Sequence, residues 1–182
     1  MPRFIAFLRA INVGGHTVKM DYLRQLFESL GFSNVETLIA SGNVIFESPA
    51  ENTQTLEKQI ESHLQQSLGY AVATFIRSAP ELAAIAKYQP FPTAELDAAG
   101  HLLYIAFLPA PPPDQAQQKL MAFRTTVDTF HIHEREVYWL CRKKIGESTF
   151  SGALLEKTIG MSATLRNSTT VKKLAAKYAA PQ

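Results

Sequence analysis

The chain has 182 residues, of which 46% are hydrophobic, and a formal net charge of +2 at neutral pH. This length and composition fit one domain or two small subdomains with a packed core. No apolar run approaches the ~18 residues of a membrane-spanning helix, and the amino terminus lacks the pattern of a signal peptide. We therefore expect a globular protein in the cytoplasm that has no membrane contact.

The charged residues are distributed unevenly along the chain. Arg3, Arg9 and Lys19 precede the first acidic residue, Asp21, and only basic charges follow Glu156. The net charge is too small to indicate a nucleic-acid-binding protein by itself. If the two ends meet in the fold, they form a positive region suited to an anionic ligand, and an ordinary solvated surface is the alternative.

The first 78 residues alternate strand and helix patterns in the order β-α-β-β-α-β. Residues 4–8 are apolar on both alternating faces, as in a central strand. The order predicts a ferredoxin-like first subdomain, residues 1–78, in an α+β fold. The predicted segments are strand 4–8, helix 20–30, strands 35–39 and 44–46, a helix that ends at Gly69, and strand 72–76.

The second of these helices has two possible starting points. Ser48 to Glu51 has the form of a capping box, and Asn52 is an alternative cap. His63 lies beside the apolar stripe of this helix, and we predict a structural role for it.

Residues 79–182 are predicted to form a second, related α+β subdomain, linked through the polar stretch 89–100. Residues 104–110 closely repeat residues 4–10, which indicates either duplication or chance similarity between strands. The expected order is β-α-β-β-α-α, with a helix in place of the last strand. The predicted segments are strand 101–108, helix 115–123, strands 129–133 and 137–141, and two closing helices around 154–159 and 171–178.

Polar residues and glycines follow the first predicted strand and the second. In the ferredoxin-like topology these two strands run parallel, so both loops open at the same end of the sheet. Glycines let backbone N–H groups approach a ligand closely, and a helix start adds further donors. The candidate ligand-binding residues here are Arg9, Asn12, Gly14 and Gly15 in the first loop and Ser41, Gly42 and Asn43 in the second.

A third candidate segment lies before the last predicted helix and contains Arg166, Asn167, Thr170 and Lys173. Capping alone explains Asn167 or the neighbouring Ser168. A cap needs no guanidinium, so Arg166 is predicted to contact either an anion or an acidic partner across the subdomain interface.

Three separated motifs carry a family resemblance. They are Leu8 to Gly15, Ser41 to Val44 with Phe46, and Ser162 to Asn167 with Lys173 and Leu174. With these motifs the chain resembles the bacterial family of domains of unknown function numbered 1697. The resemblance implies a two-subdomain α+β fold with a ferredoxin-like first part, and it names no reaction. Ala10 and Ser168 stand where a glycine and a tryptophan of that family are expected.

These observations favour binding of an anionic small molecule, a nucleotide or phosphorylated metabolite, in a cleft between the three segments. The alternative is an enzyme at the same place, in which Arg9 or Arg166 stabilises negative charge and Ser41, Asn12 or Asn43 orients the substrate. His16 is the one evident base in the motifs, so binding is preferred. In a third reading the motifs are structural, with weak contact to a nucleic-acid backbone.

The remaining signals are weak. His131 and His133 share one strand face but lack a visible third ligand, so we predict no metal site and no cofactor. Residues 43–47 lack the basic-Gly-aromatic pattern of RNA-binding sheets, so we do not expect nucleic acid to bind through the sheet face. The expected state is a monomer or a weak homodimer.

Overall fold

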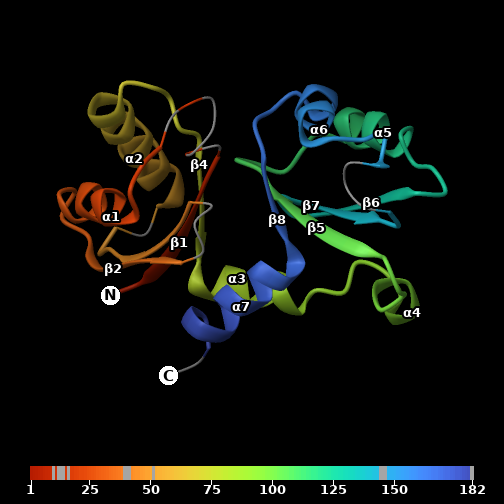
Figure 1. Cartoon of the computed structure of the whole chain (residues 1–182), viewed down its shortest axis with the longest axis horizontal. Coiled ribbons are helices and arrows are strands. Elements are labelled where there is room, and N and C mark those ends of the chain that lie inside the picture. The colour runs from red at the N-terminus through yellow and green to blue at the C-terminus, as the bar shows by residue number, and fades with distance from the viewer. Residues whose placement is uncertain are drawn as a thin grey trace. The chain divides into compact units, whose positions relative to one another are not determined.

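The computed structural model describes residues 1–9, 11, 15, 17–38, 42–50, 52–143 and 147–180. It contains two four-stranded antiparallel sheets, and helices pack against each of them (Figure 1). The predicted α+β class is therefore confirmed. The chain separates into two compact units. The first unit is Met1–Ile85 with Ala175–Gln182, and the second unit is Ala86–Leu174.

The first sheet has the strand order β2-β3-β1-β4, and β1 runs antiparallel to both of its neighbours. Because β2 is also antiparallel to β3, β1 and β2 point the same way. The elements of this part of the chain are β1 (Arg3–Leu8), α1 (Met20–Glu28), β2 (Ser33–Leu38), β3 (Asn43–Glu47), α2 (Thr53–Leu68), β4 (Thr74–Ser78) and α3 (Ala79–Lys87).

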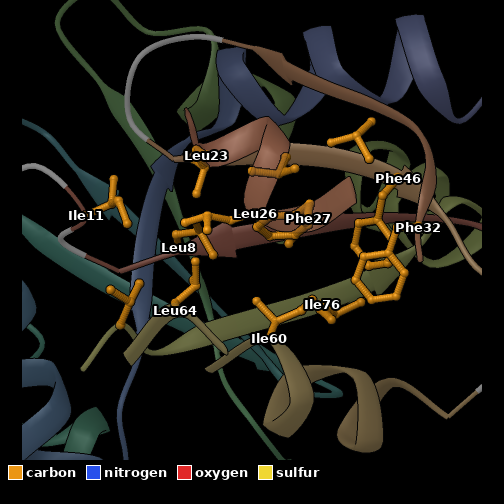
Figure 2. Close-up of a cluster of buried hydrophobic side chains, with 14 of the residues drawn as sticks. Leu8, Ile11, Leu23, Leu26, Phe27, Phe32, Phe46, Ile60, Leu64 and Ile76 are labelled. Atoms are coloured by element: carbon orange, nitrogen blue, oxygen red, sulfur yellow. The ribbon is translucent and has the colours of Figure 1, made fainter. Parts of the chain in front are cut away.

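The central strand β1 is buried on both faces, as its uninterrupted apolar run predicts. Phe4, Ala6 and Leu8 point to the face that α1 and α2 cover. On that face Leu23 of α1 lies beside Leu8, and the rings of Phe32 and Phe46 lie together toward the other end of β1 (Figure 2). The helix α1 therefore starts at the end of the sheet where β1 ends.

The ends of α2 follow local backbone chemistry. Of the two predicted starts the Asn52 cap is the one observed, since its side chain accepts a hydrogen bond from Thr55 N at 3.0 Å. At the other end Gly69 adopts φ +84°, the left-handed conformation that ends many helices. The predicted structural role of His63 is confirmed, because its Nε2 lies 2.8 Å from Ser29 Oγ and links α2 to the end of α1.

The second sheet has the order β6-β7-β5-β8, and β5 is central and antiparallel to both neighbours. α5 and α6 pack on one face of it (Figure 1). The elements are α4 (Thr93–Leu96), β5 (Leu102–Phe107), α5 (Asp114–Met121), β6 (Asp128–His133), β7 (Glu136–Cys141), α6 (Gly152–Ile159), β8 (Thr164–Asn167) and α7 (Ser168–Tyr178).

A polar cluster lies within the core of the second unit. The carboxylate of Asp128, 1% exposed, accepts hydrogen bonds from Trp139 Nε1 at 2.8 Å and from Ser148 Oγ at 2.6 Å. A carboxylate this deeply buried needs such donors to compensate for lost hydration. Trp139 thus contributes both apolar area and a hydrogen bond to this core.

The predicted order of the second half was wrong because it left out one strand between the two closing helices. Residues 164–167 form the strand β8, which pairs with β5, so the order is β-α-β-β-α-β-α and not β-α-β-β-α-α. The strand has four residues, too few for a period to be recognised, and its polar side chains are typical of a helix cap. The link 89–100 also contains the short helix α4.

The two sheets correspond strand by strand. The similar segments 4–10 and 104–110 begin in β1 and β5, the central strands. In β1, Ile5 lies opposite Ile45 of β3 and Arg77 of β4. In β5, Ile105 lies opposite Tyr138 and Arg166. This register defines which positions of the two units are equivalent.

None of the helices in the described ranges has the length and apolar character needed to cross a membrane.

Candidate functional site

The segment that leaves β1 lies against Gly42, the residue just before β3. Leu8 N donates a hydrogen bond to Gly42 O at 2.8 Å. Gly42 has φ +85°, and a Cβ atom added to it would lie 3.0 Å from Ile11 Cγ2 and 3.1 Å from Leu8 Cβ. Two segments far apart in the sequence therefore meet closely here, as expected from parallel β1 and β2.

The same segment is held from the side of β4. Arg9 N donates to Ala73 O at 2.9 Å, and the hydroxyl of Tyr70 donates to Ile11 O at 2.9 Å. Burial raises the pKa of Tyr70, so its hydroxyl stays protonated and remains a donor at neutral pH. The Arg9 side chain is exposed, so a fixed backbone presents a guanidinium to solvent.

The start of α1 adds backbone donors at this end of the sheet. Its N-cap residue, Lys19, makes no side-chain capping hydrogen bond, and Asp21 is the acidic residue in its first turn. The first N–H groups of a helix have no partner within the helix and favour negative charge. Gly15, between Arg9 and this helix, is exposed with φ +82°.

Several predicted site residues lie outside the described residues. They are Asn12, Gly14 and Ser41 of the candidate ligand set, together with Ala10 and His16.

Asn43 occupies a buried position in the hairpin. Its side chain is 0% exposed, and Nδ2 donates to Leu38 O at 3.1 Å. The residue also pairs with Phe7 and Leu38 in the sheet. This amide therefore ties the end of β2 to the start of β3, which is the structural role that the third reading of the motifs assigned to it.

Arg166 lies inside the second unit, with 8% of its surface exposed. Its Nη1 donates to Thr164 Oγ1 at 2.8 Å and to Leu165 O at 3.0 Å. Burial lowers the pKa of Arg166 to about 10, which leaves the guanidinium charged at neutral pH. It is a buried cation held by contacts of its own strand.

The other predicted residues of this segment lie at the end of β8 and in α7. Asn167 Oδ1 accepts from Thr169 N at 2.9 Å and so caps the helix, as capping chemistry predicts. Thr170 is half-buried and Lys173 is exposed. Arg9, Gly15, Gly42 and Asn43 belong to the first unit, whereas Arg166 to Lys173 belong to the second. That these segments share one cleft stays a prediction.

A second polar region of the first unit lies at the opposite end of β1. Three cavities of about 330, 430 and 310 Å³ share Arg3 as a lining residue. We call them the Arg3 groove. Its walls come from the start of β1, the edge strand β2, the ends of β3 and β4, the start of α3, and the residues Tyr178 and Ala180. The polar lining residues used below are Arg3, Asn34, Glu36, Glu47 and Tyr178.

The polar side chains of the Arg3 groove are linked by hydrogen bonds. Arg3 Nη2 donates to Glu47 Oε1 at 3.1 Å, and Arg3 Nη1 donates to Tyr178 O at 3.3 Å. Asn34 Nδ2 donates to Glu47 Oε2 at 2.9 Å, and the Tyr178 hydroxyl donates to Glu36 Oε2 at 2.7 Å. The hydrogen bond from Asn34, with a smaller contribution from Arg3, lowers the pKa of Glu47.

Sequence reasoning missed this groove. Arg3 is the first residue of the apolar strand β1, and Glu47 is the last residue of the apolar strand β3. A charged residue at such a position usually means only that the strand reaches solvent there. The signal that was present is the antiparallel pairing of β1 and β3, which places Arg3 opposite Glu47. The contribution of Tyr178 depends on tertiary structure, because it is 142 residues away from Glu36.

The predicted histidine pair belongs to an aromatic cluster. The hydroxyl of Tyr88 lies 2.6 Å from His131 Nε2, and the Tyr88 ring stacks on His133 with centroids 4.0 Å apart. Burial, and secondarily His133, lowers the pKa of His131. Within the described part of the chain, no three His, Cys, Asp or Glu side chains are grouped so as to hold a metal ion.

Comparison with known proteins supports the fold and a family. A family model described as "Protein of unknown function (DUF1697)" matches residues 1–138. The structure is similar to that of a conserved bacterial protein, SP0830 from Streptococcus pneumoniae, with a TM-score of 0.73 and 20% sequence identity. That similarity covers 96% of this chain and 97% of the other. No curated protein matches the chain.

The family match includes two of the three motifs, those around Arg9 and Gly42, and ends before the third, around Arg166. The predicted family is confirmed over the larger part of the chain, and this protein belongs to the DUF1697 family of proteins of unknown function.

Proposed function

We propose that the protein binds a small anionic molecule, a nucleotide or phosphorylated metabolite, where β1 ends in the first unit. The observation that carries this proposal is the placement of Arg9. It directly follows the buried residues Phe4–Leu8 of β1, its backbone N–H donates a hydrogen bond to Ala73 O, and its side chain is exposed. Because the backbone at Arg9 is already fixed, binding an anion would order the side chain alone, and the planar guanidinium is pre-organised for paired hydrogen bonds.

The surroundings of Arg9 favour a phosphate or carboxylate as the bound group. Guanidinium N–H groups form paired, charge-assisted hydrogen bonds with both anions. The helix α1 starts at the same end of the sheet without a side-chain cap, and exposed Lys19 at its start adds positive charge. Gly42, just before β3, also packs against Leu8 and Ile11 at this end of the sheet.

We also assign the first unit to the ferredoxin-like topology and the protein to the bacterial cytoplasm. The order β2-β3-β1-β4, with β1 antiparallel to both neighbours, supports the first assignment. The lone cysteine, Cys141, is a buried free thiol, which agrees with a reducing compartment.

The proposal is tested by thermal unfolding in the presence of inorganic phosphate, AMP, ATP and ribose 5-phosphate. At least one of these is expected to raise the Tm of the wild-type protein, because a ligand that binds the folded state stabilises it. Arg9→Ala is expected to abolish that rise. Arg24→Ala is the matched control. Arg24 is an exposed arginine on α1, and its ion pair with Asp21 is long, at 4.0 Å, and solvent-exposed, so its loss should have little effect on stability.

The control variant should keep the full ligand-induced rise in Tm. If both arginine variants reduce the rise equally, the effect is one of general charge and the proposed site is wrong. If none of the four anions shifts the wild-type Tm, the proposal of an anion-binding function fails.

A further inference from the structure

We propose that the Arg3 groove is a second binding site and that it takes a zwitterion, an amino acid or short peptide that carries both an ammonium and a carboxylate group. This site lies at the start of β1, whereas the proposed anion site lies at its end. The inference does not depend on the anion site.

Arg3 retains hydrogen-bonding capacity in the groove. A guanidinium has five N–H donors. Two of them bind Glu47 Oε1 and Tyr178 O, and the side chain is 29% exposed in a groove formed by three cavities. The remaining donors fit a carboxylate, which guanidinium binds through two parallel hydrogen bonds.

The ion pair of Arg3 and Glu47 is not required by this kind of sheet. At the equivalent position of the second unit, Leu103 of β5 lies opposite Leu140 of β7. A pair of leucines therefore fills in one sheet the place that a hydrogen-bonded ion pair occupies in the other. The charged pair is a feature of the first unit alone, and it lies where that unit has cavities.

The charges of the groove favour a ligand with both signs. Glu36 and Glu47 bring two carboxylates to the same region as Arg3. Lys177, whose Nζ lies 5.1 Å from the centre of the Tyr178 ring, adds a second positive charge beside the groove. A ligand with a single charge would therefore be repelled by one set of these groups, whichever sign it carries. A ligand whose carboxylate binds Arg3 and whose ammonium binds Glu36 satisfies both.

The dimensions of the groove also exceed those of a simple ion. Its two polar cavities have volumes of about 330 and 430 Å³. Small-molecule sites in proteins begin at about 300 Å³, so each is large enough for an amino acid or a short peptide. Tyr178 lines both cavities and joins the hydrogen bonds of Arg3 to those of Glu36.

The test is isothermal titration of the full chain with the twenty free L-amino acids and with dialanine. At least one probe is expected to bind, and its N-acetyl and C-amide derivatives are expected to bind at least tenfold more weakly, because each lacks one charge. The double variant R3L/E47L, which copies the leucine pair of the second unit, is expected to fold and to lose binding.

Glu36→Gln provides an independent variant. Its amide oxygen can still accept the Tyr178 hydrogen bond, so the groove keeps its shape while the charge that binds the ammonium is lost, and a loss of at least tenfold in affinity is expected. Arg9→Ala should bind as the wild type does, which separates this site from the anion site. The proposal is overturned if no probe binds, if the blocked derivatives bind equally well, or if Glu36→Gln binds unchanged.

Discussion

Arg77 and Arg166 occupy equivalent positions in the two sheets. Each lies on the strand after the second long helix of its unit, opposite an isoleucine of the central strand, Ile5 or Ile105. In each, Nη1 donates to the carbonyl of the preceding residue at 3.0 Å. Both are buried. A buried arginine at the equivalent position of both sheets is unusual. Its presence in both units supports duplication as their origin.

Replacing Arg166 should destabilise the fold. Arg166→Ala removes the donor that binds Thr164 Oγ1 and Leu165 O and leaves space in a buried region. We expect the free energy of unfolding, measured in urea, to fall by about 2–4 kcal/mol. Lys173→Ala, at an exposed position of the adjoining helix, should change it by less than about 0.5 kcal/mol. Equal effects of the two variants would contradict a buried structural role for Arg166.

Gly42→Ala should be more destabilising than Gly69→Ala. Both glycines have φ close to +85°, so both variants incur the same backbone strain of about 1 kcal/mol. Only at Gly42 would the added Cβ also crowd Ile11 and Leu8, whereas nothing lies within 4 Å at Gly69. We expect an additional loss of about 1–2 kcal/mol at Gly42, measured by urea unfolding. Equal losses would mean that Gly42 is not packed tightly against Leu8 and Ile11.

Trp139→Phe should lower the free energy of unfolding by more than the smaller buried apolar area alone would explain. The substitution also leaves Asp128 Oδ1 without the hydrogen bond from the indole. We expect a loss of about 2–3 kcal/mol, measured by calorimetry. In an Asp128→Ala background the same substitution should cost less, since no buried carboxylate is then left unsatisfied. Additive losses in the double variant would show that the hydrogen bond contributes nothing measurable.

His131 should make the stability of the protein sensitive to acid. Burial, followed by His133, lowers its pKa in the folded state below the usual value of 6.5, so the unfolded chain binds a proton more readily. The free energy of unfolding should therefore decrease as the pH falls from about 7 through 6.5 toward the lower folded-state pKa. His131→Gln should reduce this decrease between pH 7.5 and 5.5, and His63→Gln, on α2 of the first unit, serves for comparison.

Much of the fold follows from patterns that extend over several residues. The apolar run of β1, the glycine that ends α2 and the helical spacing of Leu56, Ile60 and Leu64 each predict the element observed. β8 was missed because its four residues hold too few repeats of the two-residue strand period to be recognised, and its pairing with β5 decides its conformation. Patterns within a segment predict helices and long strands, whereas a short strand forms only because it pairs with a strand distant in the sequence.

The sites were less accessible to sequence reasoning than the fold. The meeting of the Arg9 segment with the Gly42 turn was predictable, because the direction of two strands determines it. The contacts of Arg166 were not, since a guanidinium before a helix is compatible with either a ligand or a buried partner. The Arg3 groove depends on Tyr178, at the far end of the chain, and no local pattern announces that contact.

Asn34, which lies in the Arg3 groove, also makes the outer edge of the first sheet irregular. It adopts φ +50° at a break in the pairing of β2 with β3 between Ser33 and Glu36. β2 is an outer strand of its sheet, and a regular outer strand offers a template on which a second chain can add a strand. The irregular backbone at Asn34 interrupts that template, so it protects the sheet against edge-to-edge aggregation.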